Sequence, residues 1–525
     1  MAAAAVAVIA GAFAGQAEAK TFRWAFQGDA QALDPHSLNE TFTLSLLGNV
    51  YEGLTRRGPK LEVLPALAER WEIAEPMRWR FHLRKGVKFH NGNPFTADDV
   101  VFTYKRTIAE GSDVKTRLAT VKDVVKVDDH TVDFITTVPN PILYAEWDTW
   151  YIMDKEWSEA NGAENPTNVT AGKENYATRN ANGTGAFMVT EREVGVRTVL
   201  KPNPAWWDDA NKKHNLTEVI FTPISSDATR VAALLSGEID WMDPVPVQDV
   251  QRIEKDPNLE VLIGPETRTI FLGMDQFRDE LKYSSVKGKN PFKDKRVREA
   301  FYRAIDIDAI HKKVMRGQSA PSALMISPLQ FAAYAAEFKR LPHDPDMSKK
   351  LLAEAGYKDG FSVGMDCPND RYVNDEAICQ AVAAMLAKVG IKVDLLAQSK
   401  ALYFKKVLSP SLDTSFYLLG WTPGSNDSWN VLYNILGTPD LKSGRGKFNL
   451  AGYSNPELDA LTDRVLVETD NAKRDVMIRD AFRLLDNDVG YIPMHQQALA
   501  WAKKKTVKVA QRADNIFMLY HVTVQ

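Results

Sequence analysis

The sequence predicts an α/β protein, and three observations support that fold class. Segments with the alternation of a strand and segments with the periodicity of a helix follow one another along the whole chain. The clearest example is residues 361–396, where a strand, a helix and a second strand occur in order. The chain has 525 residues, 45% hydrophobic and 25% charged, so it can bury a large core. We expect two or three domains.

The first segment, residues 1–19, has the composition of a secretory signal. Apart from Gln16 and Glu18 its residues are apolar or small, and it ends in Ala-Glu-Ala, a small-x-small cleavage pattern. The apolar run is too short to span a bilayer. We therefore expect cleavage before Lys20, with a buried N-terminal helix as the alternative. Because no cysteine lies near this point, we expect a free periplasmic protein without a lipid anchor.

Charge and motifs exclude several function classes. The formal net charge is only -3 and no long run carries one sign, so we expect neither nucleic acid nor a membrane surface as a partner. The G-x-S-x-G, H-E-x-x-H and phosphate-loop motifs are absent, so we do not expect an enzyme. The nine histidines are dispersed, and none has a partner four residues away. We therefore expect no metal site and no cofactor.

Residues 64–106 carry the most specific pattern. Val63 to Trp71 is typical of a short helix, and Arg78 to Leu83 alternates as a half-buried strand does. A turn at Gly92 follows. Thr96 then caps a second helix, whose first turn holds acidic residues where the helix dipole favours them.

This block, which contains GVKFHNGNPFTADDVVF, closely resembles the signature of family 5 extracellular solute-binding proteins, the peptide- and nickel-type receptors of ABC importers. Further matches occur in the order expected for that family, from near the N-terminus to near the end of the chain. They are Leu33–Pro35, Asn182–Phe187, Asn203–Trp207, Ala233–Asp240, Pro291–Asp306, Leu351–Tyr357 and Gly452–Asp459.

The resemblance implies a two-lobed periplasmic binding protein fold of the large type II class, with a hinge and an extra domain inserted in lobe I. Laid on this sequence, lobe I comprises residues 20–61, 182–270 and 495–525. The inserted domain comprises 62–181, and lobe II comprises 271–494. The resemblance also implies a monomer that delivers its ligand to ABC permease subunits in the inner membrane.

One unit of lobe II can be interpreted from its residues alone. Phe361 to Asp366 predicts a strand, a helix begins at Asn374, and Ile391 to Leu396 predicts a second, parallel strand. Ligands of open α/β sheets bind beyond the carboxyl ends of strands. The loop after Asp366 is such a place and carries Arg371 and Tyr372.

Arg371 is the strongest candidate for ligand binding. A guanidinium is permanently charged and can hold a carboxylate by two parallel hydrogen bonds. In the dipeptide receptors that this chain resembles, an arginine of this loop binds the terminal carboxylate of the ligand. The alternative is an ion pair with Asp370 or Asp375. Cys367 and Cys379, the only cysteines, suit one disulfide in an oxidising compartment, which would close the loop around Arg371.

A second candidate segment runs from Leu419 to Trp429. Peptide receptors of the family have Gly-Trp, two residues, and an aspartate that pairs with the ligand's α-ammonium; here that position is Gly424. Asp427 is our candidate for the same role, with an ordinary turn residue as the alternative. Trp421 and Trp429 are candidates for the pocket wall, and burial in the core is the alternative for each.

Lobe I is expected to contribute Asn39, Glu40 and Thr43, at a helix start that can bind polar ligand atoms. Simple capping by Asn39 or Thr41 is the alternative. Arg268 lies on the segment that crosses to lobe II, and either faces the cleft or braces the hinge.

The resulting hypothesis is a periplasmic receptor that captures a short peptide or amino-acid-like solute. The alternative ligand is a non-peptide solute such as an opine, a sugar derivative, a metal chelate or haem, because Gly424 departs from the peptide pattern. Two other classes remain open at this point. They are a secreted hydrolase and a chaperone for unfolded periplasmic proteins.

Overall fold

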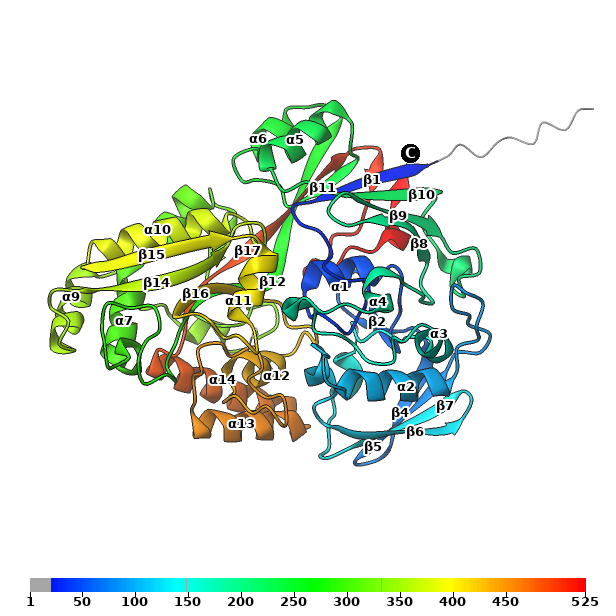
Figure 1. The fold of residues 1–525 in the computed structure, drawn as a ribbon, viewed down its shortest axis with the longest axis horizontal. Coiled ribbons are helices and arrows are strands. Elements are labelled where there is room, and N and C mark those ends of the chain that lie inside the picture. The colour runs from blue at the N-terminus through cyan, green and yellow to red at the C-terminus, as the bar shows by residue number, and fades with distance from the viewer. Residues whose placement is uncertain (1–19, 148, 332) are drawn as a thin grey trace, which may run out of the picture.

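The computed structural model describes residues 20–525 except 148 and 332. The expected signal peptide therefore lies outside the described residues. Figure 1 shows two lobes side by side with two long strands running between them. None of the helices in the described residues is long and apolar enough to cross a membrane.

One mixed sheet of 11 strands extends through both lobes, in the order β15-β14-β16-β12-β17-β11-β1-β10-β9-β8 with β13 (Ser319–Pro321) paired to β17. We call the part with β14, β15 and β16 lobe II, and the part with β1 and β8 to β11 lobe I. The strands of lobe I are β1 (Thr21–Phe26), β8 (Phe187–Glu193), β9 (Arg197–Pro202), β10 (Glu218–Pro223) and β11 (Trp241–Asp243).

Two long antiparallel strands, β12 (Leu259–Met274) and β17 (Ile492–Lys504), connect the lobes. β12 pairs with β16 (Phe416–Trp421) at its lobe II end, and β17 pairs with β11 at its lobe I end. The register between β12 and β17 shifts between Pro265 and Thr269. Since such an irregularity bends a strand pair, this shift marks the crossing between the lobes.

The βαβ unit predicted in lobe II is present. β14 (Phe361–Pro368) and β15 (Ile391–Gln398) pair in parallel along their whole length, and α10 (Asp375–Ala387) connects them. Both strands therefore end at the same edge of the sheet. The other helices of lobe II with seven or more residues are α7 (Lys295–Ala304), α9 (Pro345–Glu354), α11 (Lys400–Val407), α13 (Pro456–Val467) and α14 (Asn471–Asp488).

The inserted domain is built on a separate four-stranded antiparallel sheet, in the order β4-β5-β7-β6. Its strands are β4 (Ala68–Glu75), β5 (Arg78–Leu83), β6 (Val121–Asp128) and β7 (Thr131–Thr136). α2 (Ala97–Ile108) lies against this sheet (Figure 1) and begins as predicted. Thr96 and Asp99 form a reciprocal capping box there.

The prediction of a helix from Val63 to Trp71 is wrong. These residues form β3 (Val63–Pro65), which pairs with β2 (Thr55–Arg57), and the first half of β4. Pro65 disfavours a helix in the interior of such a segment. In addition, backbone pairing with β5 decides the conformation of a short apolar run whose periodicity is ambiguous.

Lobe I encloses an aromatic core that fixes the position of α1 (Thr41–Leu47). Trp24 of β1 lies edge-on to Phe42 of α1 and to Trp241 of β11, with ring centroids 5.9 and 5.7 Å away. Because Phe42 is the second residue of α1, this packing holds the helix start in one place. α5 (Asp227–Ser236) and α6 (Val250–Glu254) cover the same lobe near the crossing strands.

Candidate functional site

A cavity with about 1070 Å³ of empty space, counting the solvent at its mouth, lies where the two lobes and the inserted domain meet. Lobe I contributes the start of α1, and the C-terminal segment adds Asp514 and Ile516. Lobe II contributes the residues that follow β14 and β16. The polar and aromatic residues that line the cavity include Asn39, Glu40, Arg117, Glu146, Arg371, Tyr372, Trp421, Asn430, Asn434 and Phe448.

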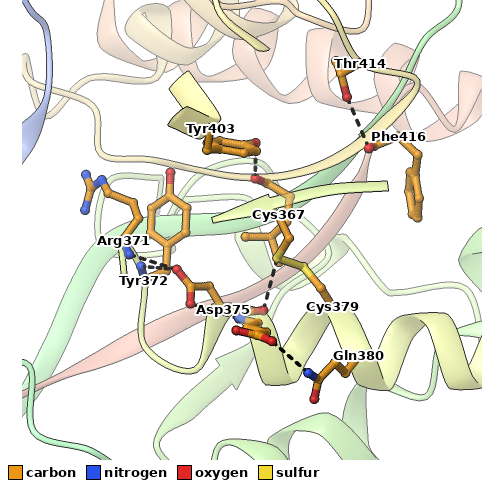
Figure 2. Close-up of a disulfide and its surroundings, with 11 residues drawn as sticks. Cys367, Arg371, Tyr372, Asp375, Cys379, Gln380, Tyr403, Thr414 and Phe416 are labelled. Carbon is orange, nitrogen blue, oxygen red and sulfur yellow. Dashed lines mark hydrogen bonds between the residues drawn. A yellow bond between two sulfur atoms is a disulfide. The ribbon is translucent and has the colours of Figure 1, made fainter. Parts of the chain in front are cut away.

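Arg371 lies in the loop after β14 and lines this cavity with only 7% of its surface exposed. Its backbone N–H and that of Tyr372 donate to the carboxylate of Asp375, at 3.0 and 2.9 Å. The Cys367–Cys379 disulfide joins the end of β14 to α10 on the other side of the loop. In Figure 2 the Arg371 guanidinium points away from that disulfide. The loop backbone is thus held from both sides.

Glu40 of lobe I meets Arg371 across the cavity. Its carboxylate caps α1 by accepting from the backbone of Phe42 and Thr43 and from the Thr43 hydroxyl. The same carboxylate lies 3.2 Å from Arg371 Nε and 3.6 Å from Lys400 Nζ. Burial alone would raise the pKa of Glu40, but the charges of Lys400 and Arg371 and the backbone donors lower it to about 2.

The cap of α1 resolves an alternative that the sequence left open. Glu40, rather than Asn39 or Thr41, is the residue whose side chain caps the helix. Asn39 does line the cavity, and its side-chain oxygen accepts from Arg117 Nη2 at 3.0 Å. Thr43 is fully buried behind Glu40 and does not line the cavity. It therefore positions the carboxylate of Glu40.

Arg268 lies in β12 behind the main cavity. It is 2% exposed and forms an ion pair with Glu266 at 2.8 Å, within the stretch where the register shifts. Its guanidinium lies 5.8 Å from the centroid of the Tyr372 ring. Arg268 lines a smaller internal cavity that it shares with Arg371 and Trp241. It therefore lies next to Tyr372 and outside the lining of the main cavity.

The two tryptophans of the second candidate segment have different positions. Trp421 lines the cavity, donates to Asn430 at 2.9 Å and lies 4.9 Å from the Phe448 ring. Trp429 is buried in the core of lobe II, where it stacks on Tyr433 at 4.7 Å. Of the two, the structure places only Trp421 in the cavity wall.

Asp427 is fully engaged inside lobe II. It caps α12 (Ser428–Val431) and accepts two hydrogen bonds from Arg474, at 2.7 and 2.6 Å. It does not line the cavity, whereas Gly424 does. Because its charge is already neutralised by a paired guanidinium, the geometry does not support Asp427 as the partner of a ligand ammonium.

Sequence reasoning missed Arg117, Glu146 and Asp514, which line the cavity, and Lys400, which contacts Glu40 without lining the cavity. Lys400 begins α11, two residues after β15 ends, so the strand-end rule that identified Arg371 applies to it equally. Glu146 belongs to no motif, and only the packing of the inserted domain brings it to the cavity. The sequence holds no signal for it.

In the part of the chain that the structure describes, the one group of acids close enough to share an ion is Asp99, Asp154 and Glu156 in the inserted domain. None of them lines the cavity. Asp154 instead accepts hydrogen bonds from Asn91 and other asparagine side chains, so this group has a structural role.

Known proteins resemble the chain along most of its length. Heme-binding protein A of Haemophilus influenzae is 27% identical over 458 residues, covering 82% of this chain and 79% of that protein. The periplasmic oligopeptide-binding protein OppA of Salmonella typhimurium is 27% identical over 496 residues, covering 89% and 85%. DppA of Helicobacter pylori, solved with the peptide STSA, superposes with a TM-score of 0.85 at 23% identity, covering 96% of this chain and 98% of that one.

The structural likeness shows that the chain has the two-lobed α/β fold of periplasmic binding proteins. The family model described as bacterial extracellular solute-binding proteins, family 5 Middle, matches residues 62–443, which is more than half of the chain. The chain therefore belongs to family 5 of the bacterial extracellular solute-binding proteins.

Proposed function

We propose that this protein is the periplasmic receptor of an ABC importer and that it captures a short peptide or amino-acid-like solute in the cavity between its lobes. The observation that carries the proposal is the pair of buried cations at the junction of the lobes. Arg371 and Lys400 both pair with the carboxylate of Glu40, and a ligand carboxylate at Arg371, which lines the cavity, would supply a second negative charge. The permease then receives the ligand, and no catalytic step is required of this chain.

Hinge closure is the mechanism that this geometry favours. Glu40 and Arg371 belong to different lobes, so a ligand that contacts both interacts fully with the closed form alone. Such a ligand shifts the equilibrium towards closure by its difference in affinity for the two forms. Moving from about 1% to about 99% closed takes roughly 5.5 kcal/mol of that difference. The ligand, once enclosed, is presented to the permease.

A non-peptide solute is the second candidate, because Gly424 lines the cavity without a carboxylate. A relative named for haem binding supports the wider range of ligands. A solute with a carboxylate but no ammonium group would need only the Arg371 end of the cavity.

Native mass spectrometry of the protein purified from periplasm tests both candidates. The measured mass of the protein is expected to be that of a chain beginning at Lys20. Denaturation should then release a bound solute, which can be identified by its own mass. A peptide would support the first candidate, and a defined non-peptide mass would support the second. Turnover of the released solute by the purified protein would contradict the receptor function.

A further inference from the structure

Glu146 is a buried acid that faces the ligand cavity from the inserted domain. It follows the short helix η2 (Leu143–Ala145) and lines the cavity with 5% of its surface exposed. Within residues 20–525, leaving aside 148 and 332, its carboxyl group accepts one hydrogen bond, from Asn140 Nδ2 at 3.2 Å. Its capacity to accept hydrogen bonds is therefore largely unused, unlike that of Asp427.

The charged groups around Glu146 compensate its charge only in part. Asp427 and Arg474 are nearby but neutralise each other through two hydrogen bonds. Arg117, on the same cavity wall, donates to Asn39. Burial raises the pKa of Glu146 to about 8, and the charge of Asp427 adds to this shift while Arg117 and Arg474 oppose it. The side chain therefore holds a proton at neutral pH until a cation reaches it.

Of the three acids that line the cavity, Glu40 pairs with Arg371 and Asp514 pairs with Arg512, whereas Glu146 forms no ion pair with a described residue. Arg371 and Glu40 are contributed by the lobes, and Glu146 is contributed by the inserted domain. Gly424 offers no side-chain oxygen, and Asp427 lies outside the cavity. A ligand ammonium enclosed here would be buried without a partner unless an acid of the lining accepts it, and an unpaired buried charge is costly.

We propose that Glu146 binds the cationic nitrogen of the ligand while Arg371 binds its carboxylate, so that the site selects zwitterionic solutes. This inference rests on the proposed function and assigns the chemical class of its ligand. On binding, Glu146 gives up its proton to solvent and pairs with the ammonium group. No other bond forms or breaks.

Isothermal titration calorimetry with matched peptides tests the inference. The probes are dipeptides and tripeptides of alanine and leucine, each with a free and with an acetylated N-terminus. The wild-type protein is expected to bind the free amines about tenfold or more tightly than the acetylated forms. Glu146→Gln should remove that preference by weakening the binding of the free amines. Glu110→Gln, which alters an exposed acid outside the cavity, is the matched control.

Proton release on ligand binding distinguishes a binding role of Glu146 from a purely structural role, because a structural role would not produce it. Titrations of wild-type protein with a free-amine peptide at pH 7, in two buffers of different ionisation enthalpy, should show a proton released on binding. The Glu146→Gln variant should release none. The measurement on the wild-type protein remains informative even if the Glu146→Gln variant does not fold.

The outcomes separate the two proposals. Free-amine peptides that bind Glu146→Gln as tightly as wild type would overturn the role of Glu146 and leave the peptide receptor intact. Equal binding of free and acetylated peptides by wild type would do the same. Failure of every peptide to bind would overturn the peptide ligand, and the inference with it.

Discussion

At the scale of the residue, Arg371 combines a permanent charge with a backbone that cannot move freely. Its loop is held by Asp375 and by the Cys367–Cys379 disulfide, so little conformational entropy is left to lose when a ligand binds. Glu40 is equally fixed by the helix start that it caps. The two side chains therefore present a preorganised surface to the ligand.

Arg371→Ala is expected to weaken an anionic ligand by about tenfold or more, because it removes a charge-assisted hydrogen-bonding partner from a buried site. Calorimetric dissociation constants for the released solute or a binding peptide measure the effect. Arg252→Ala, which changes an exposed arginine of α6, is the control. An unchanged dissociation constant for Arg371→Ala would remove this residue from the site.

Glu146 should also make the stability of the folded protein depend on pH. Because its folded pKa is raised to about 8, the folded protein keeps a proton that the unfolded chain has lost above about pH 4.5. Stability therefore falls as pH rises through that window. Glu146→Gln lacks this penalty, so its melting temperature should match wild type near pH 5 and exceed it at pH 8. Equal melting temperatures at both pH values would contradict this assignment.

Single residues also show which parts of the site could be predicted from the sequence and which could not. Arg371, Trp421 and Glu40 could be predicted because a strand end, a motif and a helix start placed them. Glu146 could not, since its position depends on how the inserted domain packs against the lobes. Trp429 and Asp427 illustrate the opposite problem. A loop motif contains both core and surface side chains, and only tertiary contacts decide between them.

At the scale of the element, patterns with two independent signals were predicted correctly. The strand–helix–strand unit after Phe361 had alternation, a helical apolar face and a terminating glycine, and α2 had a capping threonine followed by acidic residues in its first turn. The segment from Val63 to Trp71 had only a short apolar run, and its pairing as β3 and β4 depends on partners distant in sequence. The domain boundaries given above remain a prediction.

The disulfide between β14 and α10 should stabilise the element that carries Arg371. Replacing Cys367 and Cys379 together by serine is expected to lower the unfolding free energy by about 3 kcal/mol in the chain-entropy model. Ligand affinity should also fall, because the loop then loses more entropy on binding. Denaturant unfolding and calorimetry on the double variant measure the two effects. Full stability with intact affinity would show that Asp375 alone holds the loop.

At the scale of the whole molecule, contacts across the cavity mouth join the three parts of the fold. Lys447 of lobe II lies 2.7 Å from Asp113 of the inserted domain and also donates to the backbone oxygen of Ser112. Arg57 donates to the backbone oxygen of Ser425 at 2.7 Å. Because each contact joins lobe II to another part of the fold, we expect that separation of the lobes would break them and that they favour closure.

Lys447→Ala should therefore open the ligand-free protein. A partly exposed ion pair contributes up to about 1 kcal/mol, which corresponds to about a fivefold change in the ratio of open to closed forms. Small-angle scattering of the ligand-free variant should give a larger radius of gyration than wild type. Lys442→Ala, at an exposed neighbouring position, is the control. Identical radii would show that the pair does not contribute to closure.

The register shift between Pro265 and Thr269 has a consequence for the time course of transport. Arg268, inside that stretch, lies against the ring of Tyr372, the neighbour of Arg371. We therefore expect twisting of the crossing strands to loosen the contact between Arg371 and the ligand carboxylate. We expect the rate of this twist to set the lifetime of the ligand-bound receptor. A permease that separates the lobes would therefore also release the ligand.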